Sequence, residues 1–252
     1  MSTQPGIGLA VALALLLGVA VAAAQVGRLG VSRPVLTAAA RATVQLAGVA
    51  VILTAVLARW AWVGAFVAVM FAVAVGTSSR RIGAGPAWPW AALAMGAGVA
   101  PVLAVLVLTR AVPLTGLALI PLAGITIGGA MTAHSLTGRR LFAVLREEHG
   151  SYEAGLSIGL SRAEAIEEIT RRRVPEALVP ALDQTRTVGL VTLPGAFAGV
   201  LLGGGTPLQA GAAQILVLVG LLAAETVTVV VAHQLVRAGW LLPVDLRERL
   251  RP

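Results

Sequence analysis

One carboxylate stands inside an apolar stretch of this chain. Glu225 lies within the run from Gln209 to Leu235, whose other residues are mostly aliphatic or small. An acidic side chain within a membrane-length hydrophobic segment is costly, so it marks a candidate site for binding a cation or exchanging a proton. The sequence leaves open whether Glu225 meets a cation on a pathway, pairs with Arg41 or a histidine, or is protonated between helices.

Few other side chains in the apolar runs could do chemistry. Gln45 and Thr192 are candidate pathway residues, while His134 and His233 lie near run ends, where we expect structural roles. No cluster of His, Asp, Glu or Met has metal-ligand spacing, so a metal site is unknown from sequence. Cysteine is absent, and no paired acids, Ser–Lys, Ser–His or HExxH arrangement indicates an intramembrane enzyme.

Composition indicates a polytopic membrane protein. The chain has 252 residues, of which 58% are hydrophobic and 12% charged, outside the usual range of soluble domains. Its net charge of +8 comes entirely from arginine, without lysine. These arginines lie between hydrophobic runs rather than in a recognised binding module, so they indicate membrane orientation and not nucleic-acid binding.

Seven apolar runs approach the length of about 20 residues that a membrane-crossing helix needs. The sequence therefore predicts an all-α membrane protein with about seven transmembrane helices, at Gly6–Val26, Leu36–Leu57, Trp60–Val75, Trp88–Thr109, Pro113–Met131, Val188–Gly203 and Gln209–Leu235.

The arginines predict the orientation. With the N-terminus outside and the C-terminus inside, the outer turns keep only Arg59 and Arg110, as the positive-inside rule requires. A cleaved signal peptide ending near Gln25 is the alternative, but it would leave Arg28 and Arg33 outside. We therefore expect a multi-pass protein of the cell membrane, inner or plasma, whose surroundings are the lipid bilayer.

One long connection, residues 132–187, carries most of the acidic residues and reads as helices on the cytoplasmic side. Ser161 and Glu164 form a capping-box pattern, and Gly150 is a plausible helix stop. Between Gly150 and the capping box, Leu156, Ile158 and Leu160 make a short apolar helix on an aqueous face. Such a helix needs a partner groove or packs on the protein's own helices, and the sequence leaves both open.

The stretch "EAGLSIG" resembles the loop motif of permeases in ATP-binding-cassette importers, where a short helix docks on the cytosolic ATPase. The resemblance maps Glu153, Ala154, Gly155 and Gly159 onto that motif. The importer pattern continues with a Leu-Pro pair that is absent here. The resemblance implies a coupling surface that also includes Leu156, Ile158 and Ser161.

Three further blocks, "RATVQLAGV", "IPLAGITIGGAMTAHSL" and "TVGLVTLPGAFAGVLLGG", resemble the FetB-type family of permeases. Bacterial members export iron with a separate ATPase, and plant relatives are linked to aluminium tolerance. The resemblance implies a permease that pairs with a cytosolic ATPase and forms a homodimer of permeases. It also implies that ATP and magnesium bind on the partner and that this chain binds no cofactor. The chain agrees in having no glycine-lysine phosphate loop.

Small residues and prolines within the predicted spans suit helices that pack closely or bend. Static packing and hinge motion both remain open for these residues, which are Gly124, Gly128, Pro194, Gly195 and Gly199.

The sequence thus predicts a single permease domain, residues 1–252, with a coupling-helix region at 132–187. The expected function is the permease subunit of an ATP-driven exporter of a metal ion, with iron implied by resemblance. The alternative is an ion-coupled secondary transporter that uses Glu225, in which the cytoplasmic hairpin would have no partner.

Overall fold

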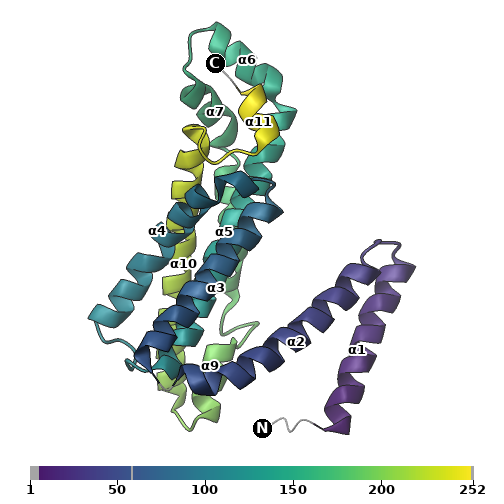
Figure 1. Cartoon of the computed structure of the whole chain (residues 1–252), viewed down its shortest axis with the longest axis vertical. Coiled ribbons are helices and arrows are strands. Elements are labelled where there is room, and N and C mark those ends of the chain that lie inside the picture. Colours follow the sequence, from purple (N-terminus) through teal and green to yellow (C-terminus); the bar gives the residue numbers. More distant parts are fainter. Residues whose placement is uncertain (1–5, 58, 251–252) are drawn as a thin grey trace. The chain divides into compact units, whose positions relative to one another are not determined.

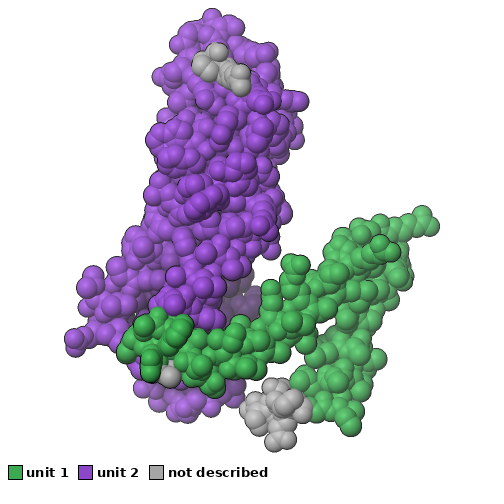
Figure 2. Space-filling model, in the orientation of Figure 1, with its two compact units in different colours: residues 1–62 green, residues 63–252 purple. Residues whose placement is uncertain are grey.

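The computed structural model describes residues 6–57 and 59–250. The protein is 82% helical, and the described residues form no strand beyond an isolated bridge between Val188 and Thr192. The all-α prediction is therefore confirmed. The chain divides into two compact units, residues 1–62 and 63–252 (Figure 2), and each is described by itself.

Unit 1 is a helical hairpin. Helices α1 (Ile7–Val26) and α2 (Ser32–Val56) pack against each other through a short turn (Figure 1). Nearly all of their apolar side chains are exposed within the unit. Such surfaces are stable against lipid or against other helices.

Unit 2 is built around α10 (Pro207–Arg237), which packs along both α4 (Trp88–Leu108) and α5 (Gly116–Glu147). The approach to α4 is closest at Gly98, where any side chain would overlap the Ala224 backbone and the Thr228 hydroxyl. Close backbone approach through small residues is how membrane helices associate without a hydrophobic drive. Helix α3 (Trp60–Arg81) precedes α4 in the chain, and η1 (Gly85–Ala87) connects α3 to α4.

Helix α5 is too long for the membrane alone. Its 32 residues extend about 48 Å at 1.5 Å per residue, against about 30 Å of hydrocarbon. One continuous helix therefore joins the span predicted at Pro113–Met131 to the cytoplasmic helix predicted after it. It ends at Glu147, before the stop expected at Gly150.

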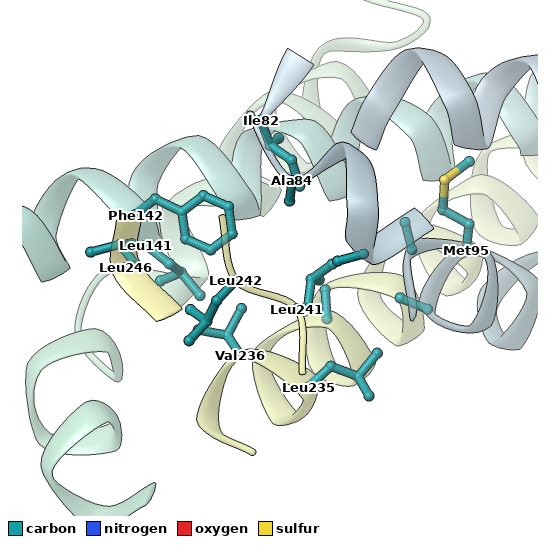
Figure 3. Packing of buried hydrophobic residues seen from close by; sticks show 14 of the residues in the cluster. Ile82, Ala84, Met95, Leu141, Phe142, Leu235, Val236, Leu241, Leu242 and Leu246 are labelled. Atoms are coloured by element: carbon teal, nitrogen blue, oxygen red, sulfur yellow. The ribbon is translucent and has the colours of Figure 1, made fainter. Parts of the chain in front are cut away.

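Short helices gather at one end of unit 2, where α6, α7 and α11 lie together, and α9 lies at the other end (Figure 1). The helices at that end are α6 (His149–Ser157), α7 (Arg162–Thr170) and α11 (Val244–Arg249), and η2 (Val174–Leu178) and α8 (Val179–Thr187) continue from α7 along α5 and α10. Figure 3 shows Leu141 and Phe142 of α5 gathered with Leu242 and Leu246, which follow α10. The buried apolar cluster of unit 2 therefore extends into this end.

The run predicted as the sixth span is not one helix. Only α9 (Gly195–Leu202) forms there, and its eight residues reach about 12 Å. The sequence predicted that Pro194 lies inside a membrane-spanning helix. The structure instead has Pro194 as the N-cap of α9. The preceding turn closes on itself, with the Gly189 N–H donating to the Thr192 carbonyl at 2.9 Å and glycine at φ +82°. Among the described residues, six helices are long and apolar enough to span a membrane.

The orientation can be tested because the chain contains no cysteine, so single cysteines report without background. Leu208 begins α10 near α9 and Val244 begins α11 at the other end, and both are exposed. We expect Leu208→Cys to react with a membrane-impermeant thiol reagent on intact cells, and Val244→Cys to react only after lysis. The reverse pattern would contradict an N-out, C-in topology.

Candidate coupling surface and intramembrane cavity

Helices α6 and α7 form a tight hairpin at the end of unit 2 that the sequence predicts to be cytoplasmic. The turn passes through Gly159 at φ +94°, a conformation that side chains disfavour. Gly155 allows the two helices to approach, since a Cβ there would lie 3.3 Å from the Ala165 Cβ. The predicted capping box is confirmed, because Ser161 and Glu164 exchange hydrogen bonds at the start of α7. Donation from Ser161 holds the pKa of the Glu164 carboxyl below its ordinary value.

The apolar stripe of the hairpin is divided between two surroundings. Leu156 and Leu160 pack against the protein's own buried cluster, whereas Ile158 at the tip is 81% exposed. The motif residues Glu153 and Ala154 are also exposed. The hairpin is therefore mounted on its own protein and presents one apolar tip.

A groove of about 790 Å³ runs beside this tip. It combines small and apolar side chains of the hairpin with charged side chains of α7 and the segment after it. Its lining is Glu148, Ser151, Ala154, Gly155, Ile158, Leu160, Ala165, Glu168, Ile169, Arg172, Arg173 and Glu176.

The segment after α10 holds the hairpin against α5. Arg146 donates two hydrogen bonds to Asp245, Nε to Oδ2 at 2.7 Å and Nη2 to Oδ1 at 3.1 Å. This guanidinium keeps the pKa of Asp245 below its ordinary value. The buried Tyr152 of α6 donates its hydroxyl to the Leu250 carbonyl at 3.2 Å. A bidentate pair is more directional than a single ionic contact, so it fixes α11 in orientation.

Helix α7 is tied to α10. Glu167 pairs with Arg237 at the end of α10, and not with Arg171, the residue that follows α7. Thr170 lies 2.9 Å from Nε2 of His233. Since the Thr170 hydroxyl donates its one proton to the Ile166 carbonyl, His233 is the donor to Thr170. A displacement of α7 is thus transmitted to α10.

Glu225 lies on α10 two turns before His233, about 12 Å along the helix axis. It borders a cavity of about 210 Å³ between α5, α8 and α10. Sequence reasoning missed Gln184, which faces the same cavity from α8, and it did not assign Thr132 of α5 to the pathway. The sequence pattern that could have indicated Gln184 is its place on one helical face with two small residues, Ala177 and Ala181, at spacings of four and three.

The other predicted pathway residues are Gln45, on α2 in unit 1, and Thr192, in the connection between α8 and α9. Thr192 does not line the Glu225 cavity. The described part of the chain has no group of three or more His, Cys, Asp or Glu placed to hold a metal ion.

The predicted packing glycines have different surroundings. Gly124 faces the side chain of Met70 on α3, and Gly128 lines the Glu225 cavity. Gly195 and Gly199 on α9 have open space beside them within the described structure. The more crowded glycine of α5 is Gly129, where a Cβ would lie 2.6 Å from a carboxylate oxygen of Glu225.

Comparison with known proteins agrees with the resemblance in the sequence. The family described as "Uncharacterised protein family (UPF0014)" matches residues 7–240. The rice protein "UPF0014 membrane protein STAR2" is 33% identical over 230 residues, which cover 89% of this chain and 80% of STAR2. No solved structure matches the chain.

Two further relatives match over about half of their length. "Protein ALUMINUM SENSITIVE 3" of Arabidopsis thaliana is 35% identical over 138 residues, 55% of this chain and 50% of that protein. "Probable iron export permease protein FetB" of Escherichia coli strain K12 is 33% identical over 141 residues, 56% of this chain and 54% of FetB.

The Thr170–His233 contact can be tested by Thr170→Val, which keeps the shape and removes the acceptor. A buried donor left unpaired costs about 1–3 kcal/mol, so we expect a lower thermal midpoint for the purified protein. Thr185→Val is the control, because Thr185 makes a similar bond to its own helix, to Ala181 at 2.8 Å. Its expected cost is about 0.5 kcal/mol or less. Equal destabilisation by both substitutions would contradict a special role for the contact.

Proposed function

This chain belongs to the UPF0014 family of membrane proteins, and on that premise we propose that it is the permease subunit of an ATP-driven exporter. A separate cytosolic ATPase supplies ATP hydrolysis and holds ATP and magnesium. Two copies of the permease pair with two ATPase subunits. The cargo is a metal ion, and the name of the FetB relative supports iron.

The exposed tip of the α6–α7 hairpin is the observation that carries this proposal. Ile158 is 81% exposed, at the end of the protein that the distribution of arginines predicts to be cytoplasmic. Ile158 adjoins a groove that further apolar side chains line, and an apolar helix tip beside such a groove suits docking on another protein. The adjoining groove adds Arg172, Arg173 and Glu176, which suit polar contacts around such a tip.

The mounting of the hairpin suits the transmission of force. Closure of a partner around Ile158 would move α6 and α7 as one body, because α6 packs closely on α7 at Gly155. Two polar contacts, Glu167–Arg237 and Thr170–His233, then connect α7 to α10. Helix α10 carries Glu225, so motion at the tip reaches the cavity through one continuous helix.

The chain itself has no means of binding ATP in the manner of such ATPases. Their phosphate loops require a glycine-rich turn followed by lysine, and this sequence has no lysine. A separate ATPase is consistent with that composition.

A secondary transporter is the second candidate. The buried Glu225 favours it, since a carboxylate in the membrane can carry a proton during ion-coupled transport. That function would give the exposed Ile158 tip no partner, so we rank it second.

The proposal is tested by purifying the tagged chain from its own cells and measuring the ATP-binding-cassette ATPase captured with it. We expect Ile158→Glu to reduce the captured ATPase at least tenfold, because the new charge would be buried in the cleft. Since Ile158 is exposed, membrane insertion and thermal stability should stay near wild type.

Val244→Glu is the matched control, because Val244 is also an exposed apolar residue at the cytoplasmic end, 55% exposed on α11. It should leave capture unchanged. Normal ATPase capture and normal metal export by Ile158→Glu would contradict the use of the hairpin as a docking element.

A further inference from the structure

The segment η2–α8 descends from the cytoplasmic end into the depth of the membrane helices. Its order of contacts along α5 shows this. Glu176 pairs with Arg140, Ala177 packs with Ala133 and Val229, and Gln184 lines the cavity beside Ile125. From Arg140 to Ile125, α5 rises about 22 Å. With the α5 span predicted at Pro113–Met131, these contacts bring α8 to the level of the hydrocarbon core, deeper than the sequence alone predicts.

The carboxylate of Glu225 enters the cavity at this depth. The residue is 8% exposed, and within residues 6–57 and 59–250 it makes no hydrogen bond or ion pair. The two histidines of the spans are engaged elsewhere, His134 with Ser78 at 2.7 Å and His233 with Thr170. Gly129 leaves the space that the carboxylate occupies. An unpaired acid at the midplane is expensive and needs a functional reason.

The neighbouring face of α8 is charged. Asp183 and Arg186 pair at 3.8 Å, with side chains 63% and 73% exposed. Exposed charges at this depth are excluded from lipid and occur against water-filled cavities or partner proteins. The non-helical connection from Val188 to Pro194 follows directly, and irregular backbone is tolerated in a membrane only under the same conditions. This side of unit 2 therefore lines an aqueous path or an interface that encloses one.

Three polar side chains that line the cavity can each offer an oxygen ligand. Glu225 contributes the charge, and Thr132 and Gln184 contribute a hydroxyl and a side-chain carbonyl. Oxygen ligands suit hard cations rather than thiophilic metals. A single carboxylate with neutral oxygens holds a cation loosely, and loose binding allows release to the other side of the membrane.

We propose that the cavity between α5, α8 and α10 binds a divalent metal cation through Glu225, with Gln184 and Thr132 as neutral ligands, and that α8 lines the route to it. This inference rests on the proposed transport function and assigns the class of cargo to one site.

The first test measures binding of Mn²⁺ to the purified full chain, from the paramagnetic resonance signal of the free ion. We expect wild type to bind, and Glu225→Gln to lose one bound ion per chain or to bind at least tenfold more weakly. Glu225→Asp keeps the charge and should retain weakened binding, and Glu248→Gln on the exposed face of α11 should bind as wild type does. Unchanged binding by Glu225→Gln, or none by wild type at millimolar Mn²⁺, would overturn the site.

The second test uses the absence of cysteine. Gln184→Cys should react with a charged, membrane-impermeant thiol reagent, and Mn²⁺ should slow that reaction at least threefold. Val219→Cys on α10, an exposed apolar position in the span, should remain unlabelled. Labelling of Val219→Cys but not of Gln184→Cys would overturn the aqueous route along α8.

Two further measurements separate this inference from the proposed function. In Arg41→Gln, unchanged Mn²⁺ binding supports the site, whereas a large gain would identify Arg41 as the partner of the carboxylate and overturn it. ATPase capture is measured on the same preparations. Failure of wild type to capture the ATPase overturns the proposed function, and failure of Glu225→Gln to lose Mn²⁺ overturns the cation site alone.

Discussion

The constraint that shapes this protein is the absence of water in the bilayer core. Each peptide group there needs an internal hydrogen-bond partner, and an α-helix provides one for almost every group. The described residues follow this rule through six long apolar helices. The exception is the stretch between α8 and α9, where a turn at Gly189 satisfies part of its own backbone. Such a break is stable only where protein or water covers it, so it identifies a face that lipid does not cover.

Helix α10 connects the two places where function is concentrated. Its cytoplasmic end meets α7 through Arg237 and His233, and its middle carries Glu225 beside Gly129. Rigid packing against α4 at Gly98 leaves little freedom for local adjustment along the helix. A packed helix with polar contacts at one end moves as a body, which is the kind of element that couples two sites in alternating access.

Much of this arrangement could be predicted from local sequence. The capping box at Ser161, the turn at Gly159 and the apolar tip at Ile158 all follow from short-range patterns, and the structure has each of them. Long-range contacts could not be predicted in the same way. Glu167 has an arginine four residues later, yet it pairs with Arg237, because the approach of α7 to α10 is set by tertiary packing.

The position of α8 illustrates the same limit. The stretch "PEALVPALDQTR" contains three charged residues, so hydropathy assigns it to the cytoplasm. Its small residues, however, form one helical face that packs along α5 and α10. Hydropathy averages over all faces of a helix, so it does not distinguish a cytoplasmic segment from one with a packed face and a charged face beside water within the membrane. The close approaches at Gly98 and Gly129 were missed because sequence shows small residues without showing which neighbour they meet.

The anchoring of the hairpin by α11 also sets an order of events during biosynthesis. The hydroxyl of Tyr152 and the guanidinium of Arg146 reach partners about a hundred residues later in the chain, at Leu250 and Asp245. The ribosome makes those partners only after α10 has been synthesised. A chain in which α10 has failed to insert would carry an unsupported hairpin, so competence to recruit a partner arises only after α10 is in place.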